Sequence, residues 1–269
     1  MISRLPPQRP LRLVFCTTPS VYSDAVLQVL MQSPHLELVG IVASTRILRK
    51  KGWSGWDAVR LLRKTGLRYA TYLWTVTTLY SLLHGLMADA QIQQVPTHAT
   101  RDINSSNSLA FVKNLQPDLL LSAHFNQLIG PELLGLPLQG SLNIHPGRLP
   151  EYKGVDPVIR ALDKAESQVG VTLHRQDEGF DTGAVLAKAG RSVAASDTLL
   201  SLNLCLFQQG AELLRDLLAD SAALPAGEPQ QPDLRYDSWP DAALVKRLRR
   251  SGRRLLDGRL WWASLRRSL

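Results

Sequence analysis

A short run in the middle of the chain, residues 141–146, carries two polar side chains that a strand would hold together. Asn143 and His145 alternate within it, so on a strand the carboxamide and the imidazole point to the same face. Side by side they make a polar site that offers hydrogen-bond donors and one group able to exchange protons. The prolines and glycines of residues 146–154 follow directly, and they predict a rigid loop that lines a crevice.

Two further stretches place polar groups at the ends of predicted strands. Residues 170–176 predict a strand that leads into an acidic, glycine-punctuated loop, in which Asp181 could reach a neighbouring imidazole. Residues 122–129 begin at the end of another buried run. Because ligands of open α/β sheets bind outside the carboxyl ends of the strands, the stretches around Asn143, Asp181 and residues 122–129 predict one shared site.

The elements that must position this site begin with a strand, a helix and a second strand. Residues 11–16 and 36–44 are apolar runs typical of buried strands, and residues 20–32 place their apolar side chains on one helical face. Ser20 or Thr18 is the expected N-cap of that helix. The loop after the first strand lacks both glycine-rich nucleotide-binding patterns, so neither of those nucleotide-binding loops is predicted here.

The alternation of strands and helices resumes after residue 92. We expect strands at 92–96, 119–123, 141–146 and 170–176, and helices that end at Leu115, span 157–164 and span 199–218, the first of them capped by Asp102 or Asn104. This order predicts an α/β fold with an open, mostly parallel, Rossmann-like sheet and helices on both faces.

The order and spacing of these motifs resemble the 10-formyltetrahydrofolate-dependent formyltransferase family. In that family a strand with the pattern Asn-x-His precedes a Leu-Pro-x-(Tyr/Trp)-(Lys/Arg)-Gly loop, and a catalytic Asp follows in a second loop. Here these are Asn143 and His145, then residues 149–154, then Asp181 within 177–183. The resemblance covers residues 11–44 and 92–218. It implies the formyltransferase fold in a catalytic domain over 1–227, with a helical insertion at 45–90 and a basic C-terminal extension at 228–269.

The resemblance also implies roles for individual residues. Asn143 would donate to an oxyanion on the formyl group, His145 would add a second donor, and Asp181 would hold the imidazolium and relay protons. The co-substrate would be 10-formyltetrahydrofolate, bound by two segments on either side of the site: Phe125, Asn126, Gln127, Leu128, Ile129, Asp177, Glu178, Gly179 and Phe180. No metal is expected. Arg148 departs from the family pattern and is expected near an anionic part of the cofactor or acceptor.

The acceptor is expected to be a small-molecule amine, such as an amino sugar, an amino acid or a natural-product intermediate. An acceptor that also carries a negative charge is among the expected ones. A tRNA acceptor is ranked low, because the 42 residues after Gly227 are fewer than the C-terminal domain of methionyl-tRNA formyltransferases needs. Glycinamide ribonucleotide is ranked low as an acceptor because its enzymes carry a phosphate-binding glycine loop after the first strand, whereas residues 17–20 of this chain contain no glycine. Two alternatives stay open: a hydrolase that releases formate from the cofactor, and a catalytically idle relative that binds folate or a partner.

The net charge of +8 is concentrated in two segments. Residues 46–68 carry +7 and residues 246–269 carry +8, so the rest of the chain is acidic. Such segments attract phosphate, nucleic acid or anionic lipid. A nucleic-acid partner is not expected, whereas the segments suit docking at a membrane or protein surface through 46–88 and 246–269, or they are solvated helix faces. Residues 69–88 are uncharged, with Val76, Tyr80 and Leu83 at helical spacing, which favours an amphipathic helix packed on the body over surface docking or a membrane span.

Composition and cysteine content narrow the class of protein. With 45% hydrophobic and 20% charged residues, the chain matches a globular protein and not a disordered one. Its only cysteines, Cys16 and Cys205, exclude a disulfide-dense scaffold. Prolines occupy the N-terminal positions where a signal peptide would be apolar, so we expect a cytoplasmic protein, with peripheral membrane attachment as the alternative. The oligomeric state is left open.

Overall fold

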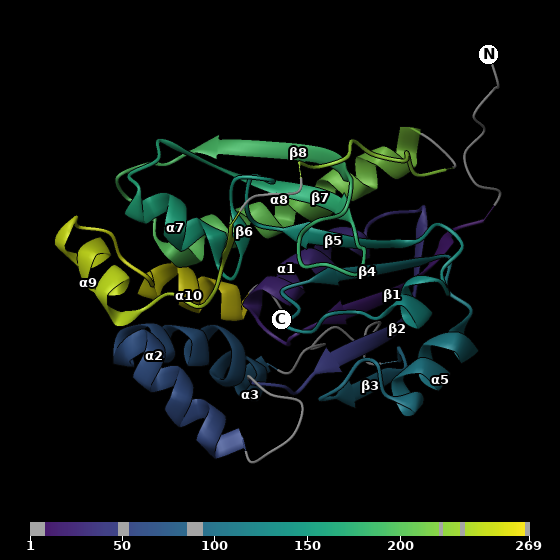
Figure 1. The fold of residues 1–269 in the computed structure, drawn as a ribbon, viewed down its shortest axis with the longest axis horizontal. Helices are drawn as coiled ribbons and strands as arrows, with labels where there is room; N and C mark the ends of the chain where they lie inside the picture. The colour runs from purple at the N-terminus through teal and green to yellow at the C-terminus, as the bar shows by residue number, and fades with distance from the viewer. Residues whose placement is uncertain (1–8, 48–53, 85–93, 221–222, 232–234, 267–269) are drawn as a thin grey trace.

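A computed structural model describes residues 9–47, 54–84, 94–220, 223–231 and 235–266 of the chain. Its centre is a seven-stranded sheet with the order β3-β2-β1-β4-β5-β7-β8 (Figure 1). The strands are β1 (Leu11–Thr17), β2 (Leu36–Ser44), β3 (Thr97–Thr100), β4 (Leu119–Ala123), β5 (Ser141–His145), β7 (Gln168–Arg175) and β8 (Val185–Ser192). β3, β2, β1, β4 and β5 run parallel, while β7 and β8 are antiparallel to their neighbours. The predicted fold class is confirmed.

Helices cover both faces of the sheet, and the alternation of β1 shows why. Leu13 and Phe15 belong to the larger apolar cluster, whereas Val14 and Cys16 belong to a smaller cluster on the opposite face. A strand buried on both faces needs such a continuous apolar run. The larger cluster includes α1 (Val21–Leu30), α7 (Pro157–Asp163) and α8 (Leu199–Asp220), and the smaller one includes α5 (Ser106–Leu115) and α6 (Pro131–Leu134).

The N-caps of α1 and α5 are both serines. Ser20 caps α1 by accepting from the Ser23 backbone N–H, as one of the two expected residues. The expectation of Asp102 or Asn104 for α5 is wrong, because Ser105 caps that helix and accepts from Ser108 N–H. Asn104 instead donates to the Leu128 carbonyl and accepts from Gly130 N–H, so its amide is engaged in holding the loop after β4.

Two strand expectations also need correction. A strand was expected at 92–96, of which 92 and 93 lie outside the described residues, but β3 begins only at Thr97, after Pro96. Proline lacks the N–H that a strand ladder needs. β8 was not predicted, because its outer half alternates exposed and half-buried side chains and carries Lys188 and Arg191. It is an edge strand, where polar residues are common.

The insertion and the C-terminal residues form a helical layer at one end of the sheet, where α2, α3, α9 and α10 lie side by side (Figure 1). Helix α2 (Ser54–Trp74) bends at Gly66, whose φ of 78° suits glycine, and continues through a π-helical turn (Thr75–Leu79) into α3 (Tyr80–His84). After a short parallel pair, β6 (Lys153–Gly154) with β9 (Tyr236–Asp237), the chain forms α9 (Ala242–Arg250) and α10 (Gly258–Arg266).

This layer packs onto the body through aromatic and apolar side chains. Tyr69, Val76 and Tyr80 are buried, and the Tyr80 ring meets Trp261 of α10 edge-on at 5.7 Å between centroids. Leu83 was expected on the same buried face but is exposed. In the described parts of the chain, no helix combines the length and the apolar character that crossing a bilayer requires. The domain boundary after residue 227 stays a prediction.

Candidate active site at the carboxyl edge of the sheet

A cavity of about 860 Å³ lies at the carboxyl ends of β1, β2, β4 and β5. The three predicted catalytic residues, Asn143, His145 and Asp181, all line it. The sheet supplies one wall, the insertion helix α2 with the π-helical turn supplies another, and Tyr236 and Trp239 close it from the C-terminal segment. The site is therefore where an open α/β sheet is expected to bind a ligand.

The imidazole and the carboxylate of this trio are held next to each other. His145 Nδ1 lies 3.4 Å from Asp181 Oδ1, and both side chains are largely buried. His145 Nε2 is 2.7 Å from the Tyr152 carbonyl oxygen, which can only accept, so Nε2 carries a proton and donates it there. Nδ1 is thus the ring atom that can exchange a proton with Asp181 or with a ligand. Asp181 is positioned by Gly154 N–H, which donates to Oδ2 at 2.9 Å.

The Asn143 carboxamide is fixed in one orientation by two neighbours. Ser122 Oγ donates to Asn143 Oδ1 at 2.7 Å, and Asn143 Nδ2 lies 3.0 Å from His174 Nε2. His174 Nδ1 donates to the Arg175 carbonyl at 2.7 Å, so in the neutral ring Nε2 is the acceptor. One N–H of the Asn143 amide is used by His174, and the second is left to serve a ligand in the cavity.

Burial keeps His174 neutral, because it lowers the pKa of this imidazole to about 4, more than the Asp181 carboxylate raises it. Sequence reasoning missed both His174 and Ser122 as functional residues. His174 lies directly opposite Asn143 on the antiparallel partner strand, and this register is not visible in the sequence. The only available signal was a polar residue at an otherwise apolar strand position.

The neutral His174 makes the stability of the fold depend on pH. Below the unfolded-state pKa of about 6.5 the unfolded chain binds a proton that the folded chain takes up only near pH 4, so stability falls as the pH drops through this window. On acidification from pH 7 to pH 5, the protonation of this residue in the unfolded chain should lower the free energy of unfolding by about 2 kcal/mol. Urea unfolding of the wild type and His174→Leu at both pH values measures it. The variant should lose less stability on acidification, and an equal loss in both proteins would contradict the assignment.

The residues predicted to bind the cofactor are only partly at the cavity. Phe125, Asn126 and Phe180 line it together with Asp181, whereas the side chains of the others do not: Gln127, Leu128, Ile129, Asp177, Glu178 and Gly179. Ile129 packs into the smaller apolar cluster, and Gln127 is buried in hydrogen bonds to Ser44, Thr100 and Ile103. Their backbone contacts to a cofactor stay a prediction. Arg148 does not line the cavity and lies 3.5 Å from Glu166 instead.

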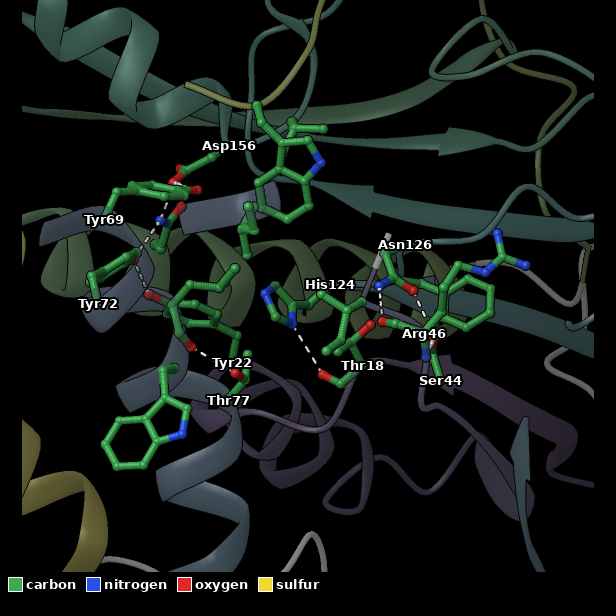
Figure 2. A pocket seen from close by; sticks show the side chains of 18 of the residues that line it. Thr18, Tyr22, Ser44, Arg46, Tyr69, Tyr72, Thr77, His124, Asn126 and Asp156 are labelled. Carbon is green, nitrogen blue, oxygen red and sulfur yellow. Dashed lines mark hydrogen bonds between the residues drawn. The ribbon is translucent and has the colours of Figure 1, made fainter. Parts of the chain in front are cut away.

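A second polar cluster, which includes Tyr69, Tyr72 and Asp156, lines one side of the cavity (Figure 2). Ser44, Arg46 and Asn126 line the opposite side. Tyr69 OH donates to Asp156 Oδ2 at 2.8 Å, and Asn203 Nδ2 donates to Oδ1 at 3.3 Å. Burial raises the pKa of the Asp156 carboxyl against these hydrogen bonds. Sequence analysis did not identify this cluster, because its members come from three elements far apart in the chain.

His124 lies between the two sides of the cavity, with Asp156 on one side of it and Asn126 on the other (Figure 2). Its Nδ1 is 3.0 Å from both the Thr18 carbonyl and Ser20 Oγ, and burial lowers the pKa of the ring. These contacts tie the loop after β1 to the end of β4. The described residues contain no group of three or more His, Cys, Asp or Glu side chains placed to hold a metal ion.

Comparison with known proteins finds formyltransferases among the relatives of this chain. The family model described as formyl transferase matches residues 88–218. GDP-perosamine N-formyltransferase of Brucella melitensis is 38% identical over 120 residues, which is 45% of this chain and 45% of that protein. Methionyl-tRNA formyltransferase of a Synechocystis species is 39% identical over 123 residues, which is 46% of this chain and 36% of that protein. The matched part thus spans less than half the length of these curated relatives.

Solved structures share the fold. Phosphoribosylglycinamide formyltransferase from Bacillus halodurans aligns with a TM-score of 0.55 at 21% identity, over 78% of this chain and 94% of that one. A sugar N-formyltransferase from a Shewanella species aligns with a TM-score of 0.55 at 18% identity, over 85% of this chain and 76% of that one. The segment that matches the formyl transferase family, residues 88–218, carries β4, β5, β7 and the predicted catalytic residues Asn143, His145 and Asp181.

Proposed function

We propose that this protein transfers a formyl group from 10-formyltetrahydrofolate to the amine of a small molecule, with Asn143, His145 and Asp181 as the catalytic residues. The observation that carries the proposal is the convergence of these three side chains on one cavity, with His145 Nδ1 3.4 Å from Asp181 Oδ1. A cavity of about 860 Å³ lies in the range of small-molecule and cofactor sites.

The residues at the cavity fit such a co-substrate. Phe125 and Asn126 line the cavity, and the Asn126 amide is held by hydrogen bonds with the Ser44 hydroxyl and the Arg46 carbonyl. When bound, 10-formyltetrahydrofolate supplies an activated formyl group.

Acyl transfer to an amine needs an oxyanion donor and a route for protons, and the chain offers both. The free N–H of the Asn143 amide can donate to the formyl oxygen as negative charge develops on it, because Ser122 and His174 prevent the amide from turning its oxygen toward the cavity. His145 Nδ1 and Asp181 Oδ1 can hold a proton between them, accept one from the attacking amine and return one to the departing nitrogen. Gly154 N–H keeps the carboxylate in place during this exchange.

The nature of the relatives supports a small acceptor. The GDP-perosamine enzyme acts, by its name, on an amino sugar linked to a nucleotide, and sugar N-formyltransferases share the fold. One solved relative, a sugar 3-N-formyltransferase, was crystallised with 5-N-formyltetrahydrofolate, which supports a folate co-substrate here. A methionyl-tRNA acceptor is the second candidate, favoured by the sequence match to the Synechocystis enzyme.

A single assay separates the candidate activities. The purified chain is incubated with 10-formyltetrahydrofolate and a panel of primary amines that includes amino sugars, sugar nucleotides, amino acids and methionyl-tRNA, and tetrahydrofolate release is followed by absorbance. We expect release that requires an amine and yields its N-formyl product. Amine-independent release with free formate would identify a hydrolase instead, and folate binding without turnover would identify a catalytically idle relative.

A further inference from the structure

Exposed apolar side chains line the cavity of the proposed active site, and because they reach solvent they mark its mouth. Eleven large hydrophobic side chains are exposed in the described residues, and five of them line this one cavity. Their exposed fractions are 40% for Leu62, 71% for Leu67, 48% for Trp74, 50% for Phe180 and 42% for Tyr236. Single exposed apolar residues are normal on a protein surface, but a group gathered at the entrance of one cavity indicates a binding surface.

These five side chains come from three separate segments that the fold brings together. Leu62, Leu67 and Trp74 belong to α2, Phe180 to the loop of Asp181, and Tyr236 to β9. The Phe180 and Tyr236 rings contact each other with 5.5 Å between centroids. Since Phe180 directly precedes the catalytic Asp181, the apolar mouth is continuous with the proposed reaction site.

Buried polar residues also line the same cavity. Asn203 is buried, and while its Nδ2 reaches Asp156 and the Tyr72 hydroxyl, its Oδ1 has no hydrogen-bond partner. The cavity therefore combines buried polar groups at Asp156 and Asn203 with the five exposed apolar side chains.

The charges at the described part of the cavity do not suggest a phosphate site. Arg46 is the one lysine or arginine of the described residues that lines the cavity, and it lies on the side opposite Asp156 (Figure 2). Its guanidinium is already engaged, with Nη2 donating to Gln127 at 2.8 Å and Nε donating to the Arg101 carbonyl. Phosphate recognition uses free arginine forks or lysines.

We propose that the acceptor is an amphiphilic amine, whose polar head enters the cavity and whose hydrocarbon part packs on Leu62, Leu67, Trp74, Phe180 and Tyr236. This inference rests on the proposed formyl transfer and specifies the substrate class of the same site. Binding an apolar chain at the mouth removes the exposed side chains from water and shields the reacting amine, so it lowers KM and excludes competing water.

The test compares matched acceptors that differ only in their apolar part. Amino-sugar glycosides and amino-acid esters are each prepared as the methyl and the octyl derivative, and kcat/KM for formyl transfer is measured below the aggregation concentration of the octyl compounds. We expect the octyl form of the accepted amine to react at least tenfold more efficiently than the methyl form, because burial of two methylene groups suffices for that ratio.

Variants locate the effect at the mouth. Leu67→Ser and Trp74→Ser should each lower the octyl-to-methyl ratio severalfold, while Leu138→Ser, a similarly exposed leucine outside the cavity, should leave it unchanged. Circular dichroism melting confirms that each variant is folded. Transfer to methyl and octyl acceptors at equal efficiency would overturn this inference alone. Amine-independent formate release with every acceptor would overturn the proposed function itself, and with it this inference.

Discussion

Replacing Asn143 by alanine is expected to lower kcat for formyl transfer by about two to three orders of magnitude, the range measured when one oxyanion donor is removed. The reason is geometric: Ser122 and His174 hold the amide so that one N–H faces the cavity, and no other side-chain amide lies on this stretch of β5. KM for 10-formyltetrahydrofolate should change little, because the contact strengthens mainly in the transition state.

The control for this experiment is a variant that weakens the same contact without removing it. Ser122→Ala leaves the Asn143 amide in place but deletes the hydrogen bond to its oxygen, so kcat should fall by about tenfold and less than in Asn143→Ala. Thermal melting checks that both proteins fold. A rate for Asn143→Ala within a few fold of the wild type would remove Asn143 from the mechanism.

The sequence was sufficient to predict what depends on local pattern. The two-residue spacing of Asn143 and His145 places both on one face of a strand, and the continuous apolar runs of β1 and β4 predict strands buried on both faces. The parallel order of these strands predicts a ligand at their carboxyl edge, and the cavity lies there. These inferences held because each depends on a few neighbouring residues and on a general rule of sheet geometry.

The remaining features depend on contacts between distant segments. The role of His174 follows from the antiparallel pairing of β5 with β7, and a shift of one residue in that register would turn its side chain to the other face. The entry of Tyr236 and Trp239 into the cavity depends on the pairing of β9 with β6, two residues each. Such short pairings leave no periodic signal, so the sequence showed a basic tail but not its place at the site.

The buried face of the insertion helix was also only partly predictable from the sequence. Its apolar spacing predicted an amphipathic helix, and Val76 and Tyr80 are buried as expected, while Leu83 is exposed. The bend at Gly66 and the π-helical turn at 75–79 change the phase of the helix, so a single regular spacing does not describe both halves. Local irregularities therefore determine which side chains of this segment face the cavity.

Replacing Asp181 by asparagine tests the proton route separately from the fold. Asparagine has the same shape and can still accept from Gly154 N–H, so the loop geometry is retained while the charge beside His145 Nδ1 is lost. Without the carboxylate the imidazole has no partner to receive a proton, and kcat should fall about a hundredfold or more.

The matched control is Asp216→Asn on α8, an exposed carboxylate whose partner is the adjacent Arg215. This control should keep wild-type rates. The free energy of unfolding of both variants should lie within about 1 kcal/mol of the wild-type value, as expected of substitutions that create no cavity. Single-turnover measurements with bound 10-formyltetrahydrofolate separate the chemical step from product release. If Asp181→Asn transfers formyl groups at the wild-type single-turnover rate, proton exchange must pass through another group, and the pairing of Asp181 with His145 serves only to support the loop.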